Sequence, residues 1–196
     1  MFEVRIHGRG GQGVVTAAAL LSAAAFEEGR HSQAFPSFGS ERTGAPVVAF
    51  CRIADAPIRV REPVMTPDAL VVQDATLVHQ VDLFAGLKGD GYVLINSART
   101  LEELGLEDLL AGRPPGRVVT LPATELAREH VGRPVPNAVL LGGLAALTGL
   151  VHLGSVAGAI RNQFPGPLGV GNVAAATAAY ELIGEAPREV ANARAD

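Results

Sequence analysis

The chain has 196 residues, enough to bury a hydrophobic core in one domain without disulfides or metals. Hydrophobic residues make up 48% of the chain, but charged residues make up 18%, below the roughly 25% typical of soluble domains. We therefore expect a subunit whose surface is partly covered by partner chains. The net charge of -4 and the lack of a Lys/Arg-rich run argue against a nucleic-acid partner, because phosphate backbones bind basic faces.

The single cysteine, Cys51, excludes a disulfide framework and a cysteine cluster for zinc or iron–sulfur. No His or Lys adjoins Cys51, so a buried thiol is expected rather than a nucleophile. The N-terminus lacks a basic region followed by an apolar stretch and a cleavage site, which predicts a cytoplasmic protein. The apolar run from Ala138 to Val151 is shorter than the ~20 residues that cross a bilayer and predicts a buried helix.

The first elements are a strand and a helix joined by glycines. Phe2 to His7 alternates apolar and polar residues, which predicts a strand. The Ala- and Leu-rich stretch from Val14 to Glu28 predicts a helix, and Gly29 ends it. His7, at the strand end, is more simply a packed or solvated histidine than a ligand contact.

Strands and helices then alternate, except that a polar loop from Ser37 to Ala45 stands where a helix would follow the second strand. Further strands are predicted over residues 31–35, 46–53, 68–74, 91–97 and 117–122. Helical segments are predicted over 76–87, 101–112 and 123–132, the second as a short helix or turn. This order predicts an α/β fold: a single Rossmann-like domain with a mostly parallel sheet flanked by helices.

The C-terminal part is predicted to be helical, over residues 137–151, 155–164 and 172–183. Asn137 and Asn172 are suited to cap the first and last of these helices. The domain is expected to span residues 1–186, and residues 187–196 form a polar C-terminal tail.

Gly8, Gly10 and Gly13 spell G-x-G-x-x-G between the first strand and the first helix. Such a loop allows a tight turn and a close backbone approach to a phosphate at the positive helix end. The alternative is that these glycines only make a tight strand-to-helix turn. A dinucleotide site normally adds an acid at the end of the second strand, and here residues 33–36 contain none.

The loop "SFGSERTG" follows that strand and offers a different anion-binding set. Arg42 is a forked donor to phosphate, and the Ser40 and Thr43 hydroxyls add hydrogen bonds. A loop of this kind beside a glycine cradle suits a ligand with several phosphates. It could equally be a solvated loop whose charges face water.

Two stretches, "GRGGQGVVTAA" from Gly8 to Ala18 and "FPSFGSERTGAPVVAFCRI" from Phe35 to Ile53, resemble the gamma subunit, or equivalent domain, of the 2-oxoacid:ferredoxin oxidoreductases of the pyruvate synthase type. The stretch "PNAVLLGGLAAL" from Pro136 to Leu147 and the "GNVAAATAAYELI" ending resemble that subunit less specifically.

The resemblance implies a non-catalytic subunit that helps to bind coenzyme A while a 2-oxoacid is oxidatively decarboxylated to an acyl-CoA. Thiamine diphosphate, Mg²⁺ and iron–sulfur clusters would be held by partners: thiamine-binding alpha and beta subunits and a ferredoxin-like delta subunit, with ferredoxin as electron acceptor. The resemblance gives no metal and no membrane contact to this chain. The residues implied to contact coenzyme A are Gly10, Gly11, Gln12, Gly13, Ser40, Arg42, Thr43 and Asn137.

Two other functions stay open at this point. The glycine motif also fits a free-standing NAD(P)-binding Rossmann oxidoreductase, although the ribose-binding acid and an acid/base set are missing. A structural subunit that binds no ligand is the second alternative. The sequence leaves open which 2-oxoacid is used.

Overall fold

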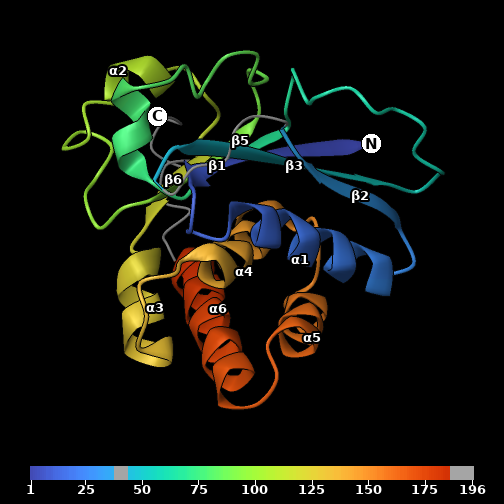
Figure 1. Ribbon diagram of the computed structural model, residues 1–196. Helices are drawn as coiled ribbons and strands as arrows, with labels where there is room; N and C mark the ends of the chain where they lie inside the picture. The colour runs from blue at the N-terminus through green and yellow to red at the C-terminus, as the bar shows by residue number, and fades with distance from the viewer. Residues whose placement is uncertain (38–43, 186–196) are drawn as a thin grey trace, which may run out of the picture.

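The computed structural model describes residues 1–37 and 44–185, which form one six-stranded sheet with helices packed against it (Figure 1). The strand order is β2-β3-β1-β4-β5-β6. The strands are β1 (Phe2–Arg9), β2 (His31–Pro36), β3 (Pro46–Ala54), β4 (Ala69–Val72), β5 (Tyr92–Asn96) and β6 (Val118–Leu121). Each of the predicted strands is present.

The sheet is mostly parallel, as the alternation predicted. β1, β4, β5 and β6 pair in parallel, and β3 is antiparallel to both of its neighbours, β1 and β2. Five strands therefore run in one direction and β3 in the other. The reason lies in the connections: a loop joins β2 to β3 directly, and a loop without a crossover helix joins antiparallel neighbours.

Most of the helical mass lies on one face of the sheet (Figure 1). The helices on this face are α1 (Val14–Glu27), α3 (Ala123–Val131), α4 (Asn137–Thr148), α5 (Leu153–Gln163) and α6 (Pro167–Glu185). The opposite face is covered by a short 3₁₀ helix η1 (Ala75–His79), the short α2 (Glu107–Leu110) and the segments between them. The flanked sheet and the helical C-terminal part are therefore confirmed.

The helix predicted over residues 76–87 is wrong beyond its first turn. After η1 the chain makes turns, and Gly86 adopts a left-handed φ of 70° in a position where a Cβ would overlap the carbonyl oxygen of Met65. Leu77 and Leu83 are buried all the same. Apolar residues in this segment thus reach the core without a continuous helix, and their spacing misled the prediction.

The last helix begins five residues earlier than predicted. Gly166 has a φ of 69° and Pro167 takes the first helical position, where its missing N–H costs nothing. Asn172 therefore lies inside α6, and its Nδ2 donates to the carbonyl oxygen of Leu168, so its predicted capping role is wrong. The predicted tail, residues 187–196, lies outside the described residues.

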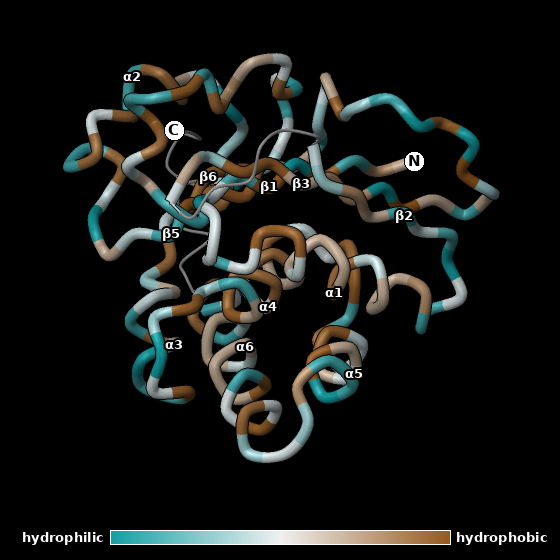
Figure 2. Tube along the Cα trace, in the orientation of Figure 1, coloured by the Kyte–Doolittle hydropathy of each residue, from teal (hydrophilic) through white to brown (hydrophobic). Residues whose placement is uncertain are grey.

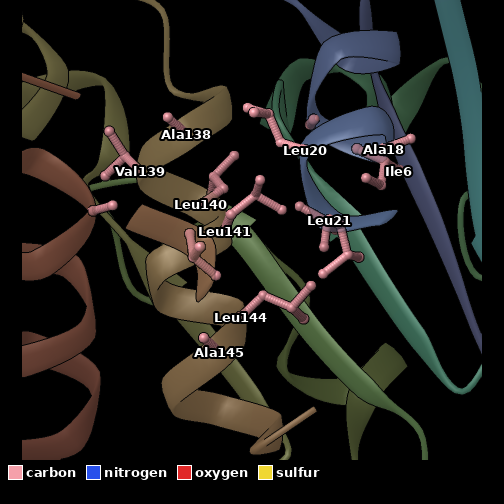
Figure 3. Close-up of a cluster of buried hydrophobic side chains, with 14 of the residues drawn as sticks. Ile6, Ala18, Leu20, Leu21, Ala138, Val139, Leu140, Leu141, Leu144 and Ala145 are labelled. Atoms are coloured by element: carbon pink, nitrogen blue, oxygen red, sulfur yellow. The ribbon is translucent and has the colours of Figure 1, made fainter. Parts of the chain in front are cut away.

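The larger core lies between the sheet and the helices. Leu140, Leu141 and Leu144 of α4 pack near Leu21 of α1 and Ile6 of β1, and each is at most 1% exposed (Figure 3). Burying one such side chain contributes about 1.5–3 kcal/mol. Figure 2 shows the same concentration of hydrophobic residues along the central strands and on α4.

The apolar run that contains α4 is a buried helix, as predicted from its length. Within residues 1–37 and 44–185, no helix has the length and hydropathy needed to span a membrane. α4 packs most closely on α6, where Gly142 lies against the backbone of Ala176: a Cβ added at Gly142 would overlap the Ala176 carbonyl oxygen.

Gly142→Ala should lower the free energy of unfolding by about 1–3 kcal/mol, because backbone rather than a flexible side chain must move. Gly154→Ala is the matched control, since a Cβ at this α5 position meets nothing within 4 Å. It should raise the free energy of unfolding by about 0.5–1 kcal/mol through helix propensity. Urea unfolding of both full-length variants measures the difference, and equal effects would contradict the close α4–α6 contact.

Candidate functional site

The candidate site lies at the sheet edge where β1, β4 and β5 end. The chain goes from β1 to one side of the sheet through β2 and β3, and to the other side through β4, β5 and β6. Between β1 and β4 the order reverses, and ligands of open α/β sheets bind at such a reversal. Helices α1, α3 and α4 all begin near this edge (Figure 1).

The glycine loop has backbone N–H groups without a partner among the described residues. Gly11 and Gly13 adopt left-handed φ values of 95° and 72°. Among the described residues, neither donates a backbone hydrogen bond, whereas the Gly10 N–H is bonded to the Ala45 carbonyl oxygen at 2.9 Å. The first N–H groups of α1 also lack intrahelical partners, because its first bond runs from Ala17 to Gly13. This is the geometry of an anion site at a helix N-terminus.

The structure brings Gly13 and Asn137 together. A Cβ on Gly13 would lie 2.5 Å from Asn137 Nδ2, so the side-chain amide rests directly on the glycine backbone. Asn137 is 3% exposed and is the first residue of α4 rather than its cap, which is Pro136. Its Oδ1 accepts from the Ala138 N–H at 2.8 Å, a local bond that replaces the predicted capping. The N-termini of α1 and α4 therefore meet at one point.

Gln12, expected to meet the ligand, instead turns its side chain into the protein. Its Oε1 accepts from the Arg9 N–H at 2.7 Å, and its Nε2 donates to Asp74 Oδ2 at 2.9 Å. These two bonds fix the loop against the end of β4. The Gln12 side chain is therefore a support of the loop rather than one of its open donors.

Sequence reasoning missed Arg9 as the residue that ties this edge together. Its Nε lies 3.1 Å from Asp74 Oδ2, and its Nη1 donates to the Gly44 carbonyl oxygen at 3.1 Å. Its Nη2 donates to Thr76 Oγ1 and Gln80 Oε1, at 2.8 and 3.0 Å. The only sequence signal was the position of Asp74, an acid directly after a predicted strand.

Asp74 is held ionised by these contacts. Burial raises the pKa of the Asp74 carboxyl, but hydrogen bonds from Thr76 and Gln12 and the charge of Arg9 outweigh it, so that the pKa lies below its usual value. The Arg9 guanidinium is therefore neutralised within the protein and adds little free positive charge to the edge.

Ser40, Arg42 and Thr43 lie outside the described residues, but both flanks of their segment are defined. The Ser37 N–H donates to the Val48 carbonyl oxygen at 2.8 Å, and the Gly44 N–H donates to the Gly10 carbonyl oxygen at 3.2 Å. The second flank is thus bonded to the glycine loop itself.

His7 and Cys51 behave as buried neutral groups. His7 is 7% exposed, and burial, with Arg5 adding to it, lowers its pKa to about 4. Burial raises the pKa of the Cys51 thiol to about 12. The expectations of a packed histidine and a buried thiol are confirmed, and at neutral pH neither side chain is a cation or a thiolate.

Comparison with known proteins agrees with this architecture. A sequence model of the pyruvate ferredoxin/flavodoxin oxidoreductase family matches residues 3–182. The pyruvate synthase subunit PorC of Methanothermobacter marburgensis is 51% identical over 183 residues, which cover 93% of this chain and 98% of the relative. The pyruvate/ketoisovalerate oxidoreductases common subunit gamma of Thermococcus kodakarensis is 49% identical, covering 92% and 96%.

Solved structures extend the comparison. The pyruvate oxidoreductase subunit PORC of Thermotoga maritima has a TM-score of 0.79 at 36% identity, covering 92% of this chain and 95% of that one. A 2-oxoglutarate:ferredoxin oxidoreductase of Magnetococcus marinus, solved with 2-oxoglutarate, coenzyme A and succinyl-CoA bound, has a TM-score of 0.70 at 17% identity. This second match covers 95% of the present chain but 31% of the other, and it shows a shared fold.

The resemblance seen in the sequence is therefore confirmed over nearly the whole chain. This chain belongs to the pyruvate ferredoxin/flavodoxin oxidoreductase family, as a gamma-type, non-catalytic subunit of the oxidoreductase.

Proposed function

We propose that this subunit binds the phosphate part of coenzyme A while the assembled enzyme decarboxylates a 2-oxoacid, forms an acyl-CoA and passes electrons to ferredoxin. The observation that carries the proposal is the glycine loop, whose Gly11 and Gly13 N–H groups lie where α1 and α4 begin. Each helix N-terminus carries about half a positive charge, so two converging ends attract an anion.

The site suits binding rather than chemistry. His7 and Cys51 are neutral, and Arg9 is paired with Asp74. Backbone N–H groups remain as donors, and such donors fix phosphate oxygens without taking part in bond cleavage. Coenzyme A carries a diphosphate and a separate phosphate, which matches a cradle built for anions.

Arg42 supplies the second part of the proposed contact. It stands two residues before Gly44, which is bonded to Gly10. Since two residues span at most about 7 Å, the chain length from Gly44 would allow Arg42 to reach a phosphate on the loop. Thr43 and Ser40 would add hydroxyl donors in the same segment.

Partner subunits would complete the enzyme. Thiamine diphosphate with Mg²⁺ and iron–sulfur clusters, held by alpha, beta and delta subunits, would supply decarboxylation and electron transfer, and this chain would hold coenzyme A for the acyl group. The Thermococcus kodakarensis relative is named as common to pyruvate and ketoisovalerate oxidoreductases. A gamma subunit common to two enzymes supports placing oxoacid selectivity on other chains.

Gly11→Asn should raise the KM for coenzyme A by about ten-fold or more, because asparagine tolerates a positive φ while its side chain occupies the ligand side of the loop. The KM for the 2-oxoacid should change little. Steady-state kinetics of the assembled enzyme measure both values.

Gly29→Asn is the matched control for this variant. Gly29 also has a positive φ, 76°, with nothing within 4 Å of an added Cβ, but it follows the opposite end of α1. Its KM for coenzyme A should equal that of the unmodified enzyme. Equal effects of the two variants would show that backbone strain, and not ligand contact, is responsible.

Arg42→Ala should also raise the KM for coenzyme A, by the loss of a charge-assisted contact of about 1.5–3 kcal/mol, while the KM for the 2-oxoacid is kept. Arg59→Ala removes an equal charge at an exposed position of the segment between β3 and β4 and serves as the control. An unchanged KM for coenzyme A in Arg42→Ala would remove this segment from the site.

The two alternative functions have their own test. Tight NAD(P)H binding by the chain would favour a dinucleotide site. If the chain binds neither NAD(P)H nor coenzyme A, a structural subunit is favoured.

A further inference from the structure

Gln73, directly after β4, carries a buried side-chain amide that no group in residues 1–37 and 44–185 satisfies. The residue is 1% exposed, and neither its Nε2 nor its Oε1 has a hydrogen-bond partner in this described part of the chain. Its backbone is fully paired: the N–H donates to the His7 carbonyl oxygen at 2.7 Å, and the carbonyl oxygen accepts from Asn96 Nδ2 at 2.8 Å. The position of Gln73 is therefore fixed, and its side chain alone is unsatisfied.

Gln73 lies beside the start of α1. Along β4, Ala69 and Val71 face the helices while Leu70 and Val72 face the other side, so alternation sends the Gln73 side chain toward the helices. A Cβ placed on Gly8 would lie 3.1 Å from Gln73 Cβ and 2.6 Å from Val14 Cγ2. Gln73 and the first turn of α1 thus meet at the glycine that opens the motif.

A buried amide without a hydrogen-bond partner is unfavourable, because it loses its hydrogen bonds to water and forms none within the protein. Orphan groups of this kind call for an explanation, and a binding site is one place where they occur. Here both a donor and an acceptor are open on one amide. An ionised phosphate accepts hydrogen bonds but donates none, so a matching ligand group must be neutral and must offer both functions.

We propose that the Gln73 amide binds a secondary amide in the pantetheine arm of coenzyme A, next to the phosphate held by the N-terminus of α1. This assignment rests on the proposed function of the glycine loop. Pantetheine contains two such amides, each with one N–H and one carbonyl oxygen, the complement of the Gln73 side chain. Gln73 thereby distinguishes coenzyme A from nucleotides that present phosphates alone.

Gln73→Met keeps the side-chain volume and removes both polar atoms. In the assembled enzyme, isothermal titration calorimetry should show that this variant weakens the affinity for coenzyme A by about ten-fold. This is the loss expected for about one or two neutral hydrogen bonds. Adenosine 3′-phosphate 5′-diphosphate, which has all three phosphates of coenzyme A but no pantetheine arm, should bind as it does to the unmodified enzyme. The melting temperature of the full-length chain should rise by about 2–4 °C, because an unsatisfied buried group is gone.

Gln33→Met is the matched control, since the Oε1 of Gln33 on β2 also has no hydrogen-bond partner among the described residues. Gln33 lies opposite Arg52 in the β2–β3 register, at the other end of the sheet from the glycine loop. Gln33→Met should leave coenzyme A binding unchanged. If Gln73→Met stabilises the chain and binds coenzyme A normally, the amide is a packing defect and the proposal is overturned. If Gln73→Met weakens the binding of both ligands equally, Gln73 acts on the phosphate part of the ligand, which also overturns the pantetheine assignment.

The proposed function has its own, separate readout in this experiment. Gly11→Asn should weaken the binding of both coenzyme A and adenosine 3′-phosphate 5′-diphosphate, since both carry the same phosphates. If Gly11→Asn affects neither ligand, the glycine loop is not the phosphate site, and that result is distinct from either outcome for Gln73→Met.

Discussion

The contact between Gly13 and the Asn137 amide determines the geometry of the site. Because a Cβ at Gly13 would lie 2.5 Å from Nδ2, glycine is what lets α1 begin so close to α4. The two helices therefore direct their N-terminal ends at the same part of the sheet edge. α4 is held there by α6, whose backbone touches it at Gly142. The convergence of donors thus depends on two glycines that bring backbones together, rather than on charged side chains.

The sequence predicted the sheet well because its signals there are local. Apolar alternation and flanking turn residues located every strand to within about two residues. Helix boundaries were less accurate where a pattern had two explanations. Leu77, Val81 and Phe84 have helical spacing, yet they reach the second face of the sheet from a short 3₁₀ helix and the turns after it. Asn172 is a good cap by type, but Pro167 starts the helix earlier, and no local rule ranks the two.

The site was predictable only where it is local in sequence. The glycine loop follows from its own spacing, whereas for Asn137 the residues predicted a helix cap and only the family resemblance implied a ligand contact. Arg9 and Asp74 are 65 positions apart, so their pairing depends on β1 lying next to β4, which a single sequence does not reveal. Gln73 gave no signal at all: it stands out because its amide has no partner among the described residues, which can be seen only once the fold is known.

A cradle of neutral donors suits a subunit of a multi-subunit oxidoreductase, where partner chains would keep water away from the ligand. A lysine or arginine left without an anion in a water-poor crevice loses its hydration, which costs far more than burying a neutral amide. Among the described residues that form this edge, the cation Arg9 is paired with Asp74. Backbone N–H groups and helix dipoles need no such counter-charge and are oriented by the fold itself. The remaining unfavourable free energy is that of burying the neutral Gln73 amide without hydrogen bonds. A ligand with a complementary donor and acceptor would remove it.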